Sequence, residues 1–133
     1  MATVAKSGTP SLATRNPCPA HQVGSGFKAG EAIGAGDPCY LKASDGLVYK
    51  SIGTTANAAA KVDGWSAGAS ANGEAVTLLT DVDFYYGAAM SPGDRLYISL
   101  TAGAIQNATS AGGTGAIGKV IDATRIRVWA STY

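Results

Sequence analysis

Apolar and polar residues alternate over much of the chain from Phe27 onward. The longest alternating run covers residues 76–86, and its period of two residues predicts β-structure. Because this run is long for a single strand, we expect Asp81 to mark a bend or a chain reversal within it. No stretch combines the 3.6-residue period of a helix with capping residues, so strands are expected to dominate the fold.

The clearest hairpin signal is Ser44-Asp45-Gly46, which separates strands expected at residues 39–43 and 47–52. We predict a three-residue loop with its glycine in the left-handed region, because this register sets Leu41 opposite Tyr49. In this register the two lysines of the hairpin share the outer face of the sheet.

Turn residues and short apolar runs predict the remaining elements. Ser91-Pro92-Gly93-Asp94 is typical of a turn, because proline presets φ at the second position. Elsewhere we expect a strand with Leu96, Ile98 and Leu100 on one face, a final strand pair at residues 116–121 and 125–130, a short strand at 104–107 and one helical turn at 57–61. In the final pair, Ile126 and Val128 are predicted to point inward, and the two arginines outward. Short strands at intervals of about 8–12 residues predict an all-β barrel or sandwich.

Residues 1–26 differ from the rest of the chain. They carry Pro10, Pro17 and Pro19 among scattered Ser, Thr and Gly, without a sustained apolar period. Such a stretch cannot bury enough apolar surface by itself to offset the entropy lost on ordering. It is either a disordered tail or an extended arm that becomes ordered against a partner. We predict an extended N-terminal arm over residues 1–26, because a tail without a partner would more often be highly charged, followed by a small β domain over residues 27–133.

Charge and composition narrow the classes of function. The chain has 133 residues, with 10 Lys and Arg against 9 Asp and Glu, and charged residues make up 14% of it, against roughly 25% in ordinary soluble domains. This balance offers no electrostatic footprint for nucleic acid or an anionic membrane. The uncharged stretches are too polar to span a bilayer, and the N-terminal residues do not resemble a secretory signal. A surface with few charges suits burial against a protein partner.

Two patterns that could indicate catalysis or cation binding are better explained as strand. Gly64-Trp65-Ser66-Ala67-Gly68 matches the nucleophile elbow, which needs a strand-to-helix turn with an acid and then a histidine downstream. The sole histidine, His21, lies upstream, and no helix is expected after Ser66. Asp81 and Asp83 lack the further oxygen donors that Ca²⁺ requires. We therefore expect no enzyme.

Cys18, His21 and Cys39 form the one set of soft metal donors in the chain. A thiolate and an imidazole three positions apart can reach one metal, but Zn²⁺ prefers four ligands, so Asp37 or a second subunit would have to complete the site. A disulfide between the two cysteines is an alternative. In the third alternative, both cysteines are free thiols and His21 is a surface residue without a ligand role. No other cofactor is expected.

Aromatic residues suggest a contact surface. Tyr85 and Tyr86 are adjacent, so they cannot both point into the core of a two-faced strand, and Trp129 falls on the face of the final arginines. Exposed Tyr, Trp and Arg are typical of interface hot spots, although amphipathic aromatics at a barrel rim would give the same pattern. Our candidate partner-binding residues are Val4, Leu12 and Arg15 in the arm, with Tyr85, Tyr86 and Trp129 in the domain.

A set of motifs over about residues 27–130 resembles the tailed-phage capsid decoration, or cement, proteins. The first is Gly30-Glu31-Ala32-Ile33 leading to Gly36-Asp37 and Tyr40, followed by Asp45-Gly46-Leu47-Val48-Tyr49-Lys50. The other segments that match in order are residues 62–67, 73–78, 91–97 and 116–120. Each motif alone is mostly turn chemistry, and the resemblance rests on their order and spacing.

The resemblance implies a small β-barrel or tulip-like domain that binds the outside of an icosahedral shell. The implied partner is a major capsid protein with the HK97-type fold, and the implied form is a homo-oligomer, often a trimer. The protein would be made in the bacterial host cytoplasm and would reside on the outer capsid surface of the virion. The arm and the Tyr85–Tyr86 strand are then expected to contact the shell or sister subunits.

Two alternatives remain open at this point. One is another virion part built on the same module, such as a head-fibre base or a tail component. The other is a small carbohydrate-binding module, because small β domains with exposed Tyr and Trp also bind sugars.

Overall fold

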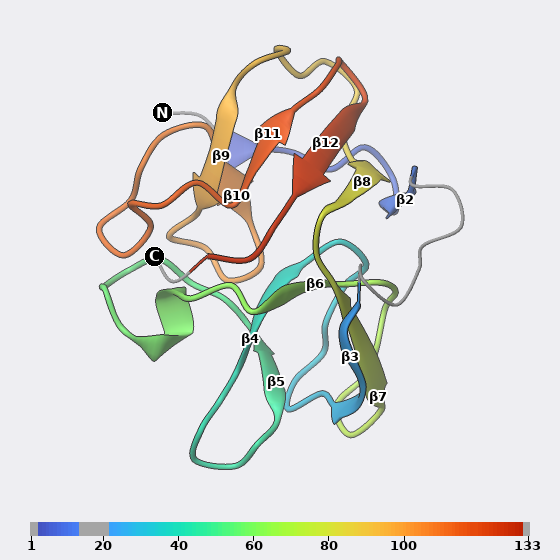
Figure 1. Cartoon of the computed structure of the whole chain (residues 1–133), viewed down its shortest axis with the longest axis vertical. Coiled ribbons are helices and arrows are strands. Elements are labelled where there is room, and N and C mark those ends of the chain that lie inside the picture. The colour runs from blue at the N-terminus through green and yellow to red at the C-terminus, as the bar shows by residue number, and fades with distance from the viewer. Residues whose placement is uncertain (1–2, 14–21, 132–133) are drawn as a thin grey trace.

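The structure is a computed structural model that describes residues 3–13 and 22–131. Two antiparallel sheets form a small β-barrel-like domain, with the larger sheet curled into a half-barrel (Figure 1), which confirms the all-β prediction. The larger sheet has the order β1-β10-β9-β11-β12-β8-β2, and the smaller has β3-β7-β6-β4-β5. The strands are β1 (Thr3–Val4), β2 (Ser11–Leu12), β3 (Gln22–Lys28), β4 (Pro38–Leu41), β5 (Val48–Lys50), β6 (Gly64–Ser66), β7 (Ala75–Leu79), β8 (Val82–Tyr85), β9 (Arg95–Ile98), β10 (Ile105–Gln106), β11 (Gly118–Val120) and β12 (Arg125–Val128).

The chain passes from one sheet to the other at Asp81. Strand β7 ends at Leu79 in the smaller sheet, and β8 begins at Val82 in the larger sheet. Asp81 has a φ of 56°, a left-handed conformation that Asp tolerates better than most residues. The long alternating run is thus two strands, and the predicted bend at Asp81 is confirmed.

Apolar side chains form two buried clusters. The larger cluster contains Phe84, Leu96 and Ile126, whereas the smaller is built around Val76 and Leu78. Trp65 connects the sheets, because it belongs to β6 of the smaller sheet but packs in the larger cluster. Its indole Nε1 also donates a hydrogen bond of 3.0 Å to the carbonyl of residue 129.

The facing of the final strands follows the predicted alternation. Ile126 and Val128 are fully buried, whereas Arg125 and Arg127 project outward, as expected. The prediction that Leu100 shares one strand face with Leu96 and Ile98 is wrong, because Leu100 is 52% exposed whereas the other two are buried. Strand β9 ends before it, at Ile98, so the alternation no longer fixes its side.

The predicted register of the first hairpin is wrong by one residue. Leu41 pairs with Val48, and the Lys42 amide donates to the Leu47 carbonyl, so the loop has four residues, 43–46. Its glycine has a positive φ of 71°, as expected.

A polar cluster accompanies this longer loop. Tyr49 donates to Asp45, which also accepts from the Leu47 amide, and the Lys42 ammonium lies 4.9 Å from the centroid of the Tyr49 ring. Lys50 lies opposite Cys39 on the other face of the strands, so the two lysines do not share a face.

Residues 3–12, which we call the closing segment, cover both edges of the larger sheet. Strand β1 pairs with β10 at one edge, and β2 pairs with β8 at the other. Between them the Ser7 amide donates to the Tyr86 carbonyl at 2.7 Å, and Lys6 forms an ion pair with Asp37. This part of the predicted arm therefore pairs with its own domain. Contact of the arm with a neighbouring molecule stays a prediction.

The boundary predicted after residue 26 needs correction. Strand β3 (Gln22–Lys28) crosses that position and pairs with β7 of the smaller sheet. The strand pairing of the domain therefore extends to Gln22.

The predicted helical turn is confirmed as a short 3₁₀ helix, η2 (Ala58–Ala60). Asn57 caps it by accepting a hydrogen bond of 3.0 Å from the Ala59 amide. Within residues 3–13 and 22–131, no helix has the length and apolar character that a membrane span needs.

Candidate binding surface

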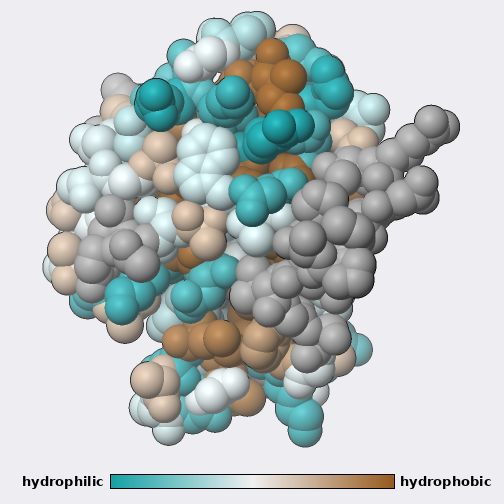
Figure 2. Space-filling model, in the orientation of Figure 1, coloured by the Kyte–Doolittle hydropathy of each residue, from teal (hydrophilic) through white to brown (hydrophobic). Residues whose placement is uncertain are grey.

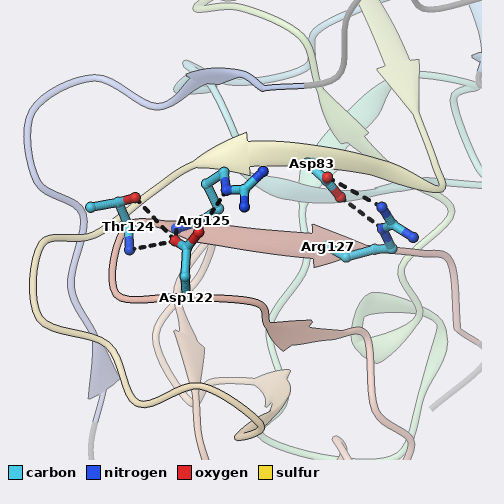
Figure 3. Close-up of polar contacts among 5 residues, drawn as sticks. All are labelled: Asp83, Asp122, Thr124, Arg125 and Arg127. Carbon is cyan, nitrogen blue, oxygen red and sulfur yellow. Dashed lines mark hydrogen bonds and ion pairs between the residues drawn. The ribbon is translucent and has the colours of Figure 1, made fainter.

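The outer face of the larger sheet brings together the polar residues of β8 and β12. Asp83 pairs in register with Arg127, and Tyr85 pairs with Arg125. Because alternate residues of both strands, such as Phe84, are buried in the core, these side chains project outward. Figure 3 shows Asp83, Arg125 and Arg127 on the two strands.

Arg127 and Asp83 form a two-point contact. The guanidinium donates from Nε to Oδ1 at 2.7 Å and from Nη2 to Oδ2 at 3.2 Å, and Asp83 holds the pKa of Arg127 above its ordinary value. The Arg127 side chain is 53% exposed, so the pair adds little to stability. Its geometric effect is to fix the direction of a planar cation on the surface.

A second ion pair lies where β11 turns into β12. Asp122 accepts hydrogen bonds from the Thr124 amide at 2.9 Å and from Arg125 Nε at 2.7 Å. These bonds lower the pKa of Asp122 to about 2, with the Thr124 amide the largest cause. The carboxylate thus orders the turn and holds Arg125 beside Tyr85.

The two adjacent tyrosines have different environments. Tyr85 is 50% exposed next to Arg125, whereas Tyr86 is only 2% exposed. Burial raises the pKa of Tyr86. The prediction that Tyr86 contacts a partner is therefore wrong. The period of two residues already indicated that Tyr86 is buried, because it lies two residues beyond the core residue Phe84.

Trp129 is half-buried at the end of β12, on the face of Arg127. Its indole Nε1 donates to the Ala116 carbonyl at 2.8 Å, so the polar edge of the ring is already occupied. Part of the ring remains open to solvent, as a rim position of a contact surface would require.

The arm candidates have different outcomes. Val4 and Leu12 are partly buried and pack against the larger core cluster of their own chain. Arg15 lies outside the described residues.

Cys39 is a fully buried free thiol in the smaller core cluster. Its Sγ donates to the Asp37 carbonyl at 3.3 Å. Burial raises the pKa of the Cys39 thiol, and the nearby Asp37 carboxylate raises it further. Because zinc binds the thiolate, this environment opposes a ligand role for Cys39. The other proposed donors, Cys18 and His21, lie outside the described residues.

The structure gives Ser66 a packing role in β6. It is fully buried, donates to the Gly34 carbonyl and accepts from the Asp37 amide at 3.1 Å. The predicted strand is confirmed at this position, and the geometry of a nucleophile elbow is absent.

Asp37, which sequence analysis considered only as a possible fourth zinc ligand and as part of a turn motif, accepts several hydrogen bonds that hold the fold together. It is 5% exposed and accepts from Lys6 and from the Gly34 amide at 2.7 Å. The Gly36-Asp37 motif was the available signal. Two further outward cations, Arg95 and Lys119, were also missed, because their relation depends on long-range register.

A groove of about 540 Å³ runs beside the closing segment. Its lining is mostly small residues with Met90, and Lys6 and Asp94 are its ionisable members. Lys6 forms an ion pair with Asp37, which does not line this groove.

Comparison of the chain with protein-family models, with curated proteins and with solved structures found no match.

Proposed function

We propose that the protein is a structural component that binds the outer surface of a tailed-phage capsid and stabilises it. The observation that carries the proposal is the ordered outer face of the larger sheet, where a half-exposed Tyr85 pairs with the ion-paired Arg125 and lies two residues from Asp83, which holds Arg127. Fixed aromatic and arginine side chains are the usual anchors of protein interfaces, because little freedom is lost when they bind. The motif order over residues 27–130, which resembles decoration proteins, supports the same conclusion.

A mechanism follows from mass action. A protein that binds adjoining subunits of an assembled shell, and not the free subunits, stabilises only the assembly. Repetition over many equivalent sites allows each contact to be modest. A homo-oligomer, for which we favour a trimer, would engage several subunits of an HK97-type shell at once. The contact face in this proposal is the outer face of the larger sheet rather than the closing segment, which is occupied in its own domain.

The test is co-sedimentation of the full chain with immature and with expanded shells of the phage that encodes it. We expect saturable binding to expanded shells and a higher temperature for release of packaged DNA. Binding to neither form would contradict the proposal. Binding to isolated tails or fibres would favour another virion part, and a sugar-specific signal on a glycan array would favour a carbohydrate-binding module.

A matched pair of variants localises the contact. Tyr85→Ala should weaken shell binding by at least about tenfold, as for an interface anchor. Leu100→Ala removes the other large exposed apolar side chain of the described residues and should change binding by less than about twofold. Equal binding of the two variants would remove Tyr85 from the contact face. An electron-density map of the particle would then show which face meets the shell.

A further inference from the structure

Three cations lie side by side across the outer face of the larger sheet. Lys119 of β11 pairs in register with Arg127 of β12 on one side and with Arg95 of β9 on the other, and all three are exposed. Adjacent strands are about 4.8 Å apart, so the three side chains start within about 10 Å. We call these residues the cation row. In Figure 2, strongly hydrophilic side chains gather over this upper part of the molecule.

The cation row is unfavourable in the isolated chain, because like charges directly opposite each other destabilise a sheet. Among the strand registers of the described residues, the two pairs of like charge both contain Lys119. Asp83 neutralises Arg127 from the far side, on β8. Within the described part of the chain, no acidic side chain forms an ion pair with Arg95 or Lys119.

We infer that the cation row docks a protein surface that presents two carboxylates about 5 Å apart. Such a spacing occurs between residues one turn apart on a helix and between opposed residues on antiparallel strands. Arg95 and Lys119 would each take one carboxylate through charge-assisted hydrogen bonds. Arg127 would keep its ion pair with Asp83 and would therefore not bind a carboxylate of the partner.

The surroundings favour discrete carboxylates over a polyanion. Asp83 lies at one end of the row, and Asp122 lies in the adjoining turn. A nucleic acid or an anionic membrane would bring negative charge against both, whereas a protein surface can match positive and negative positions one by one. The inference rests on the proposed function, since it places the carboxylates on the capsid shell.

The test compares Lys119→Glu with Lys28→Glu in binding to expanded shells. Lys28 is the control, because it is exposed on β3 of the smaller sheet and pairs with Ala75. Lys119→Glu should weaken binding by at least about tenfold and flatten its dependence on salt. The same variant should raise the thermal midpoint of the free protein, since the new carboxylate would lie between two arginines. Lys28→Glu should change binding by less than about twofold.

Lys119→Gln keeps the length of the side chain and provides a second variant. It should bind with an intermediate affinity and fold at least as stably as the wild type. A lower thermal midpoint in both Lys119 variants would assign Lys119 a structural role and overturn the inference.

The outcomes separate this inference from the proposed function. Wild-type binding with unchanged binding of Lys119→Glu would overturn the inference and leave the function standing, whereas failure of the wild type to bind any shell would end both. Loss of self-association, or of binding to double-stranded DNA, in place of shell binding would show a different occupant and also overturn the inference.

Discussion

The two sheets use their charged residues differently. Around the smaller sheet, two carboxylates make local hydrogen bonds: Asp45 accepts from Tyr49, and Glu31 accepts from the Lys50 amide at 3.0 Å. In the larger sheet, Arg95 and Lys119 project to solvent without an acidic partner among the described residues. Polar groups of the first kind hold loops in place, whereas those of the second kind add nothing to the fold. In the proposed function, the larger sheet is therefore the one that we expect to contact the partner.

The largest expected effect is on the link between the sheets. Trp65→Ala removes the side chain that joins β6 to the larger core cluster and leaves the Trp129 carbonyl without its donor. We expect a loss of about 3–5 kcal/mol in the free energy of unfolding, measured by urea denaturation. Leu100→Ala is the surface control and should stay within about 0.5 kcal/mol. A loss below about 1 kcal/mol for Trp65→Ala would mean that the sheets are stabilised separately.

A second prediction concerns how the closing segment packs. Gly36 and Gly46 both have positive φ, but a Cβ on Gly36 would lie 2.8 Å from Pro10 Cβ, whereas one on Gly46 would meet nothing within 4 Å. Gly46→Ala should cost roughly 1–2 kcal/mol from backbone strain alone. Gly36→Ala should cost about 1–3 kcal/mol more, because it also crowds Pro10. Equal losses of unfolding free energy would show that this contact does not constrain the segment.

The smallest effect is a pH dependence at the turn between β11 and β12. Because folding lowers the pKa of Asp122 from 3.8 to about 2, its stabilisation is present above about pH 4 and is lost as pH falls toward 2. Asp122→Asn should therefore lower the thermal midpoint at pH 6. Near pH 2 the variant and the wild type should melt alike. A difference independent of pH would assign the effect to the shape of the side chain rather than its charge.

Much of the fold was predictable because its signals are local. Alternation fixed the facing of Ile126 and Val128, and the length of the run from residue 76 placed a break at Asp81. The predicted register of the hairpin was wrong by one residue. It was based on alternation alone, which takes no account of the hydrogen bond from Tyr49 to Asp45 in the loop. Leu100 failed because the end of β9 depends on where its neighbours stop pairing.

The candidate site was predictable only in part. The alternation of inward and outward side chains predicted that Tyr85 and Trp129 lie on the outer face. The same rule could have excluded Tyr86. The cation row was not visible, because Arg95 and Lys119 are far apart in sequence and meet only through sheet register. Such long-range pairings are set by the packing of the whole domain and not by local pattern.

One stretch of chain shields the backbone of both β8 and β10. A proteolytic cut that released it would uncover two rows of unpaired N–H and C=O groups on the same molecule. With an exposed strand edge on each side of the sheet, every copy could pair with two neighbours. The assembly would then be an open-ended filament and not a closed ring. We expect clipped protein to form filaments, so that the residues before Ala13 protect the molecule against its own copies.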